Sequence, residues 1–264
     1  MSPWILAMIG WAVMAIVMAA LWRVQKSRGD AGIVDVAWGL GVGFLGMFFS
    51  AMSTIGDSTR RVLIAALALI WALRLSAHIF ARLRRLPEDG RYQTLKSQWG
   101  DRAQWNLFLF FQVQAFWSVL FALPMLLAAR NPVPAFTTWD VAAIIIWLAA
   151  VAGEMLADRQ LSAFRMNPAN RGQVCRQGMW RYSRHPNYFC EWLHWWAYVF
   201  LAVGATGGWL TVLGPVLMLF FLLKVTGIPP TEAQALKSRG EAYREYQRTT
   251  SVSFPWPPKN GALP

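Results

Sequence analysis

Long apolar runs recur along the whole sequence and are separated by short polar loops. A helix rises about 1.5 Å per residue, so about 20 apolar residues cross the roughly 30 Å of hydrocarbon in a bilayer. The runs that approach this length lie near 4–22, 33–53, 62–81, 105–128, 139–157, 188–204 and 208–226. They predict an all-α polytopic membrane protein, a bundle of about seven transmembrane helices.

The composition also indicates a membrane protein. Hydrophobic residues make up 56% of the 264 residues and charged residues only 14%, against about a quarter charged in soluble domains. The net charge of +12 fits basic loops at a membrane surface. No soluble basic stretch is long enough to hold DNA, so we expect no nucleic-acid partner.

The basic residues are concentrated in every second loop. If the N-terminus lies outside and the spans alternate, 21 of the 25 Lys and Arg residues fall in four inner segments, 23–32, 82–104, 158–187 and 224–264. Three fall outside, and Arg74 lies within a span. Cytoplasmic loops carry an excess of Lys and Arg, so the pattern predicts an N-out, C-in orientation.

The cysteines and the apolar N-terminal segment argue against three further features: a disulfide framework, a metal site and a cleaved signal peptide. Cys175 and Cys190 form no disulfide framework and have no metal-ligand spacing, so we expect no metal site. The apolar stretch from Pro3 to Trp22 has no basic segment ahead of it and is long enough to span, which argues against a cleaved signal peptide. Without an internal repeat, residues 1–264 are expected to form a single transmembrane domain.

Ionisable side chains inside apolar spans are costly and are therefore candidates for function. Asp35 stands at the start of the second run, where it either faces the helix dipole or supplies a carboxyl group to a substrate pocket. Trp71, Arg74 and His78 follow at i, i+3 and i+7 and share a helix face. They either fix the helix register through a buried ion pair or line a cavity.

A second polar segment lies at the end of the fifth apolar run and continues beyond it. Glu154 and Asp158 are four residues apart, and Arg165 follows further along the same predicted helix. The plain interpretation is a solvated helix end. Two acids followed by arginines also suit a binding face at the membrane surface.

The densest polar segment covers residues 178–196. Arg184 and His185 stand just ahead of a proline that suits the first turn of a helix, and basic residues at a helix N-terminus can bind a phosphate. Asn187, Glu191 and His194 then follow at i, i+4 and i+7, on one stripe. An apolar helix does not need such a stripe for packing alone, so we expect it to face inward and bind a ligand.

The tail pairs Tyr243 and Tyr246 with Arg244 and Arg248. This pattern is typical of an amphipathic interfacial helix whose arginines reach the headgroups. The other interpretation is a flap that closes over an anionic cofactor.

These motifs resemble a known family. The segment SRHPNYFCEW, the acid-and-arginine helix upstream and the two tyrosines of the tail resemble the steroid 5-alpha-reductase-like membrane reductases, closest to a bacterial branch of uncharacterised proteins. The resemblance is strongest from Gly153 to Pro255. It implies seven helices in a bacterial inner (cell) membrane, NADPH bound within the bundle from the cytosolic side, and hydride transfer to a carbon–carbon double bond conjugated with a ketone.

The resemblance also implies roles for individual residues in a cofactor half at about 139–258. Asn187 and Glu191 match residues that hold the nicotinamide end, and Asp158 and Arg165 match residues that contact the nucleotide part. The complete set of expected NADPH-binding residues is Glu154, Asp158, Arg165, Arg176, Arg184, His185, Asn187, Tyr188, Glu191 and Tyr246.

The expected catalytic residues are Asp35, Trp71 and His78. By spacing, Asp35 and Trp71 stand where the family has a Glu and a Tyr that polarise the ketone. Asp35, protonated in an apolar site, or His78 would stabilise the charge that builds on the acceptor oxygen. A lipophilic, steroid- or isoprenoid-like enone would enter from the bilayer, among the membrane lipids.

Two alternatives remain open. Membrane methyltransferases of the isoprenylcysteine and phospholipid type, which use S-adenosylmethionine, share the RHP–x–Y segment and a tail pattern that matches Glu232, Leu236, Tyr243 and Tyr246. The arginine cluster and the polar stripe favour the reductase. A non-catalytic lipid-binding protein of the same fold is the third hypothesis, because Cys190 replaces the family's glycine.

Overall fold

The computed structural model describes residues 1–85 and 87–259, and every regular element among them is helical. The chain divides into two compact units. The N-terminal unit comprises Met1–Asp140 and Leu201–Thr211, and the C-terminal unit comprises Val141–Phe200 and the chain from Val212. Each unit is described by itself.

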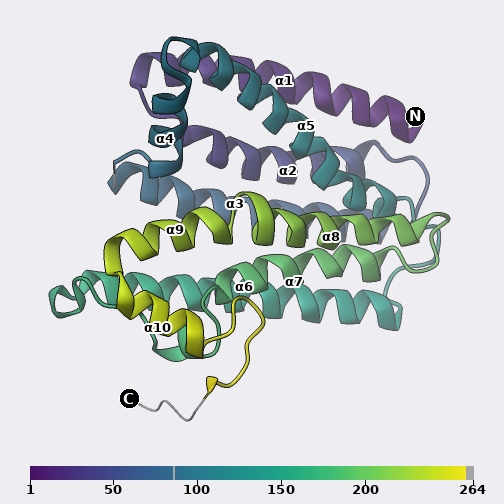
Figure 1. Ribbon diagram of the computed structural model, residues 1–264. Coiled ribbons are helices and arrows are strands. Elements are labelled where there is room, and N and C mark those ends of the chain that lie inside the picture. The colour runs from purple at the N-terminus through teal and green to yellow at the C-terminus, as the bar shows by residue number, and fades with distance from the viewer. Residues whose placement is uncertain (86, 260–264) are drawn as a thin grey trace. The chain divides into compact units, whose positions relative to one another are not determined.

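Four long helices and one short helix build most of the N-terminal unit (Figure 1). The long ones are α1 (Pro3–Arg28), α2 (Ile33–Met52), α3 (Ser58–Arg85) and α5 (Ala103–Ala129), and α4 (Gly90–Trp99) runs across one end. Glycine lets α2 approach α3 closely, because a methyl group at Gly43 would lie 2.2 Å from the Cβ atom of Ala72.

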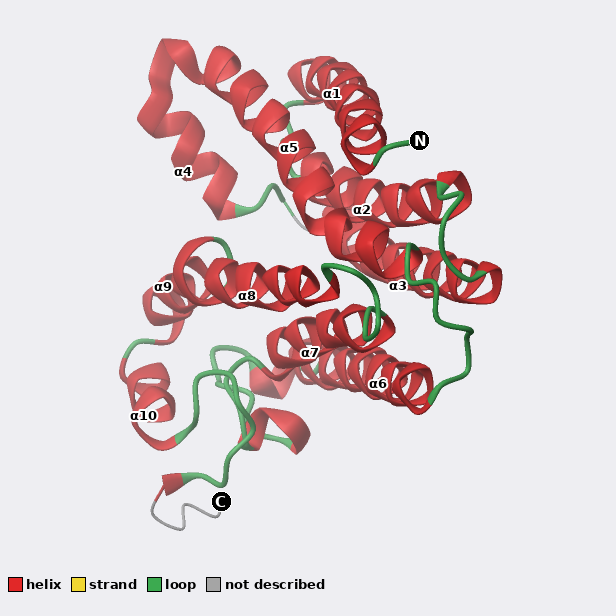
Figure 2. Cartoon of the chain, turned by 90° about the vertical axis from the view of Figure 1, so that its right-hand side faces the viewer, coloured by secondary structure: helices red, strands yellow, loops and turns green. Residues whose placement is uncertain are grey.

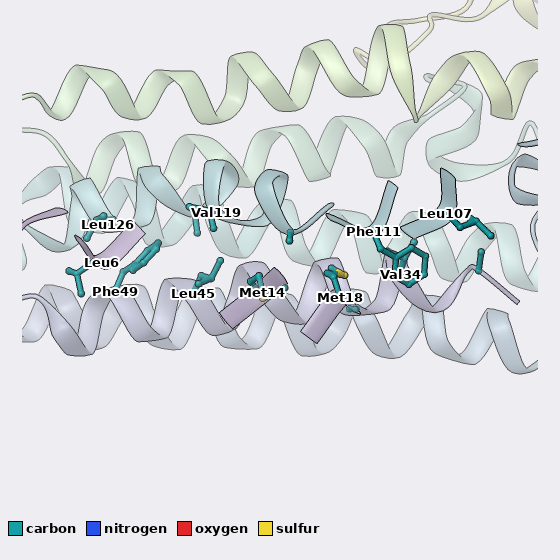
Figure 3. Close-up of a cluster of buried hydrophobic side chains, with 14 of the residues drawn as sticks. Leu6, Met14, Met18, Val34, Leu45, Phe49, Leu107, Phe111, Val119 and Leu126 are labelled. Carbon is teal, nitrogen blue, oxygen red and sulfur yellow. The ribbon is translucent and has the colours of Figure 1, made fainter. Parts of the chain in front are cut away.

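An apolar cluster fills the space between α1, α2 and α5 (Figure 3). Leu6 and Met14 from α1, Phe49 from α2, and Phe111 and Leu126 from α5 are almost completely buried in it. The outward faces of the same helices carry large apolar side chains that are exposed. This distribution is expected for helices that face each other on one side and lipid on the other.

The C-terminal unit is built on α6 (Thr138–Met166), α7 (Pro186–Leu201) and α8 (Leu213–Phe220), which run side by side (Figures 1 and 2). A π-helical turn, Phe221–Val225, links α8 to α9 (Ile228–Arg239), and α10 (Glu241–Thr249) follows. The helix α7 starts at Pro186 as predicted, because the fixed φ of proline suits the first helical position.

Within the described ranges, six helical segments are long and apolar enough to cross a membrane: Pro3–Arg28, Ile33–Met52, Ser58–Arg85, Gly90–Ala129, Thr138–Met166 and Gly208–Arg239. The remaining expected span, 188–204, corresponds to α7, which has 16 residues and is shorter than the roughly 20 that a span needs. The prediction of an all-α polytopic membrane protein is confirmed.

Candidate functional site

The helices α6 and α7 pack against each other where the polar stripe lies. A methyl group at Gly153 would lie 2.8 Å from the sulfur of Cys190. One turn away, Asn187 Nδ2 donates a hydrogen bond to Asp158 Oδ1 at 3.2 Å. Residue numbers rise along one helix as they fall along the other, so the pair is antiparallel. The contact joins two residues that the sequence placed in one cofactor site.

The other two residues of the stripe, Glu191 and His194, are buried within the C-terminal unit. Glu191 is 7% exposed and His194 is 1% exposed. Trp195 Nε1 donates to Glu191 Oε1 at 3.4 Å, and His194 Nδ1 lies 3.8 Å from the same oxygen. The ring of Tyr198 packs edge-on against His194. The carboxylate of Glu191 is therefore surrounded by an imidazole and aromatic rings.

Glu154, the other acid expected on this face, is also buried. It follows Gly153, so it lies near the level of Cys190 and Glu191 in the helix pair. A buried carboxylate is costly unless polar groups surround it. Glu154 and Glu191 therefore bring two buried acids to about one level of the helix pair.

A second polar cluster gathers around Glu232 of α9, and we call it the Glu232 cluster. Arg184 Nε donates to Glu232 Oε1 at 2.7 Å, and His185 Nε2 lies 3.2 Å from the same oxygen. Gln247 Nε2 donates to Glu232 Oε2 at 2.8 Å, and the hydroxyl of Tyr243 donates to Oε1 at 3.4 Å. The cluster therefore ties the loop before α7 to α9 and α10.

Arg184 also holds the segment after α10. Its Nη1 donates to the carbonyls of Gln247 and Thr250 at 2.9 and 2.6 Å, and its backbone N–H donates to the carbonyl of Ser251 at 2.9 Å. The sequence suggested a phosphate ligand at this position. In the structure the Arg184 guanidinium is instead engaged by Glu232 and two carbonyls, because a cation just ahead of a helix can equally bind a carboxylate from elsewhere in the chain.

Burial sets the protonation of this cluster. It lowers the pKa of His185 below its usual value, although the carboxylate of Glu232 acts in the opposite direction. Burial also raises the pKa of Tyr243, and the negative charge of Glu232 adds to the effect. The neutral imidazole and the intact phenol are therefore favoured around the Glu232 carboxylate.

The tail forms the predicted amphipathic helix, α10. Tyr246 is buried and donates through its hydroxyl to the carbonyl of Trp180 and, at 3.1 Å, to that of Ser183. Arg176 is exposed, and its guanidinium lies 5.5 Å from the centre of the Tyr246 ring. The Tyr246 hydroxyl is thus hydrogen-bonded to the loop before α7, while the cationic side chain of Arg176 is exposed.

The other expected cofactor residues lie on both sides of this loop. Arg165 is exposed in the last turn of α6. Tyr188 stacks on His185 with ring centres 5.2 Å apart, and its hydroxyl lies 3.2 Å from the hydroxyl of Thr231. The structure therefore brings Tyr188 to the edge of the Glu232 cluster.

The N-terminal unit contains a third polar cluster, around Asp35 of α2. Tyr92 of α4 donates its hydroxyl proton to Asp35 Oδ1 at 2.7 Å, and Arg91 Nη2 lies 3.0 Å from Oδ2. Arg91 also bonds Asp89. The sequence suggests an apolar site for Asp35. In the structure Asp35 accepts a hydrogen bond from a phenol and pairs with an arginine.

Trp71 and His78 do not share one environment. Trp71 is fully buried and packs edge-on against Trp38 at 6.3 Å between ring centres, whereas His78 is exposed on α3. The sequence does not indicate that Tyr92 is a partner of Asp35. The Arg–Tyr pair beside Asp89 was visible in the sequence, but its link to Asp35, 57 residues away, was not.

The fold and these buried polar clusters define the class: an all-α polytopic membrane protein with ionisable groups enclosed in its helical units. A family model described as "Protein of unknown function (DUF1295)" matches residues 21–250. The chain therefore belongs to the DUF1295 family. No curated protein and no solved structure matches it.

Proposed function

We propose that the protein is an NADPH-dependent membrane reductase that acts on a lipophilic enone, as its resemblance to the steroid 5-alpha-reductase-like enzymes implies. The observation that carries the proposal is the buried stripe on α7. Asn187 is bonded to Asp158 of α6, and Glu191 lies one turn further inside. The burial of this stripe on the helix pair α6 and α7 supports the proposal.

The residues suit two parts of the cofactor, the carboxamide of its nicotinamide ring and its phosphates. A carboxamide needs an acceptor for its N–H₂ group and a donor for its carbonyl; Glu191 accepts, and Asn187 can do both. The exposed guanidinium groups of Arg165 and Arg176 suit phosphates, with which arginine pairs bidentately. Arg184 supports the site indirectly, because it fixes the loop before α7.

NADPH, when bound, would supply the hydride. The chain's own residues orient the amide end and keep water away from it. The reaction also needs a proton donor, a role that the resemblance implies for Asp35. In the N-terminal unit this carboxyl group is held by the Tyr92 hydroxyl and by Arg91. The proposed N-out, C-in orientation would place the nucleotide side in the cytoplasm.

Nucleotide binding tests the proposal before any substrate is known. Mass spectrometry of detergent-purified protein should detect a co-purifying NADP(H), and added NADPH should raise the unfolding temperature. Glu191→Gln and Asn187→Ala should each weaken binding by about 10- to 100-fold, the usual cost of a charge-assisted hydrogen bond. Glu245→Gln, an exposed acid on α10, is the control and should bind like the parent. Equal binding by all variants would refute this site.

A second experiment addresses the proton. Once an enone substrate is found, Asp35→Asn should lower turnover by about 100-fold or more, the usual contribution of a general acid, while NADPH binding stays within about twofold. Unchanged turnover in Asp35→Asn would remove this residue from the mechanism.

One observation favours the methyltransferase as a second candidate. Glu191 lies among His194, Trp195 and Tyr198, and an acid beside aromatic rings suits an organic cation such as the sulfonium of S-adenosylmethionine. The same binding assay separates the two. Stabilisation by S-adenosylmethionine and not by NADPH would favour this candidate, and response to neither would favour a non-catalytic lipid-binding protein.

A further inference from the structure

A recess of about 370 Å³ opens on the N-terminal unit at the end of α1. Its walls are Trp22, Arg23, Lys26 and Ser27, from the last two turns of the helix. The recess is shallow and open and is formed by one helix, so it offers contacts to a small charged group rather than enclosing a ligand. The proposed reductase does not use these residues.

The recess is cationic. Arg23 and Lys26 are exposed, and neither forms an ion pair among the described parts of the chain. The acids that follow are already engaged, because Asp30 accepts from the backbone N–H of Gly32 at 2.8 Å and Glu88 pairs with Lys96 at 2.7 Å. The charge of Arg23 and Lys26 is therefore available to an anion.

The surroundings of the recess match the interface of a membrane. The Trp22 ring packs edge-on against Phe108 of α5, and Phe108 stacks on Trp105, which is exposed. Further along α1, Trp11 and Ile16 present large exposed apolar surfaces. Tryptophan is enriched at the level of lipid headgroups, and basic residues at the end of a span attract anionic lipids. The cations thus lie where a lipid phosphate would be.

We propose that this recess binds the phosphate of an anionic phospholipid. Arg23 would hold the phosphate oxygens bidentately, and Lys26, whose ammonium lies 5.8 Å from the Trp22 ring centre, would add a second charge. The acyl chains would lie along the exposed apolar faces of α1 and α5. The site distinguishes phosphatidylglycerol from phosphatidylcholine, because choline adds a positive charge close to the two basic side chains.

Native mass spectrometry of the full-length protein in micelles containing equal amounts of phosphatidylglycerol and phosphatidylcholine tests the proposal. The parent should retain phosphatidylglycerol preferentially. R23Q/K26Q should weaken this retention by about tenfold or more, since each basic residue near an anionic surface contributes about fivefold. The control R171Q/K237Q removes two other exposed basic residues and should keep the preference. The charge-conserving R23K/K26R should stay within about threefold of the parent and shows that loss of charge, not misfolding, is responsible.

A separate measurement distinguishes a lipid from a free anion. Inorganic phosphate at millimolar concentration should neither displace phosphatidylglycerol nor raise the unfolding temperature, because it lacks acyl chains. Displacement by phosphate would assign the recess to a soluble anion and overturn the lipid proposal. So would equal retention of both lipids by the parent, or an equal loss in R23Q/K26Q and R171Q/K237Q.

Discussion

In each unit a buried arginine pairs with a carboxylate and with backbone carbonyls, as Arg60 and Arg184 show, but the two arrangements differ. Arg60 in the N-terminal unit meets Asp140 through two hydrogen bonds, Nε to Oδ1 at 2.7 Å and Nη2 to Oδ2 at 2.8 Å. It also donates to the carbonyls of Val133 and Pro134. Both charged side chains are 1% exposed.

Arg184 in the C-terminal unit shares its carboxylate. Glu232 is 15% exposed and also bonds His185, Gln247 and Tyr243. The Arg60 pair is a closed structural contact with no group that titrates near neutral pH. The Glu232 cluster contains an imidazole and a phenol and reaches solvent. A buried arginine is thus held by a carboxylate in both units, but of these two arrangements the Glu232 cluster is the one with groups that can respond to pH or to a ligand.

Arg60→Met should have the largest effect on stability. It leaves Asp140 charged and buried without its main partner, which typically costs about 3–5 kcal/mol. The readout is the thermal unfolding of purified protein in detergent. Arg60→Met/Asp140→Leu removes both charges and should recover most of the loss. If Arg60→Met is as stable as the parent, the pair of Arg60 and Asp140 does not stabilise the N-terminal unit.

Glu232→Gln should have an intermediate effect of about 1.5–3 kcal/mol, the range for hydrogen bonds to charged groups. The variant keeps the size of the side chain but removes the charge that Arg184 and His185 face. Hydrogen exchange should increase at residues 241–256 and stay unchanged around Arg60. Glu245→Gln, whose arginine partner is exposed, should change stability by less than about 0.5 kcal/mol. If Glu232→Gln lowered the free energy of unfolding as much as Arg60→Met does, the expected difference between the Glu232 cluster and the Arg60 pair would be contradicted.

The smallest expected effect is a pH dependence in the C-terminal unit. Because burial lowers the pKa of His185 in the folded protein, the unfolded chain binds this proton first as the pH falls. Stability contributed by the neutral imidazole is therefore present above about pH 6.5 and declines below it, by at most about 1.4 kcal/mol per pH unit. His185→Gln should reduce this slope between pH 7 and 5, measured by thermal unfolding against the parent. Parallel curves for the two proteins would contradict it.

The helices could be predicted from the sequence because their signals are local. An apolar run of sufficient length and a proline at the first turn place α7 within two residues at its N-terminus. Helices α3 and α6 extend beyond the predicted spans, to Arg85 and Met166, because a helix can continue into water with polar residues that hydropathy does not register.

The candidate site was predictable only in part. The i, i+4, i+7 spacing identified the inward stripe of Asn187, Glu191 and His194. The partners of Asp35 and Arg184 lie 57 and 48 residues away, and no local pattern encodes such pairings. The sequence therefore identified the charged residues but not whether each one faces a ligand or another part of the chain.

The contacts between the segment after α10 and the loop before α7 have a consequence for biosynthesis. Ser251 and Ser253 accept hydrogen bonds from Arg184 and Ser183, and Trp256 donates to the carbonyl of Tyr182. The Ser183–Ser253 contact spans 70 residues of sequence, so the loop ahead of α7 stays incomplete until the segment after α10 has been synthesised. Quality-control proteases would meet this loop in nascent chains, whereas most helices of the N-terminal unit could pack earlier.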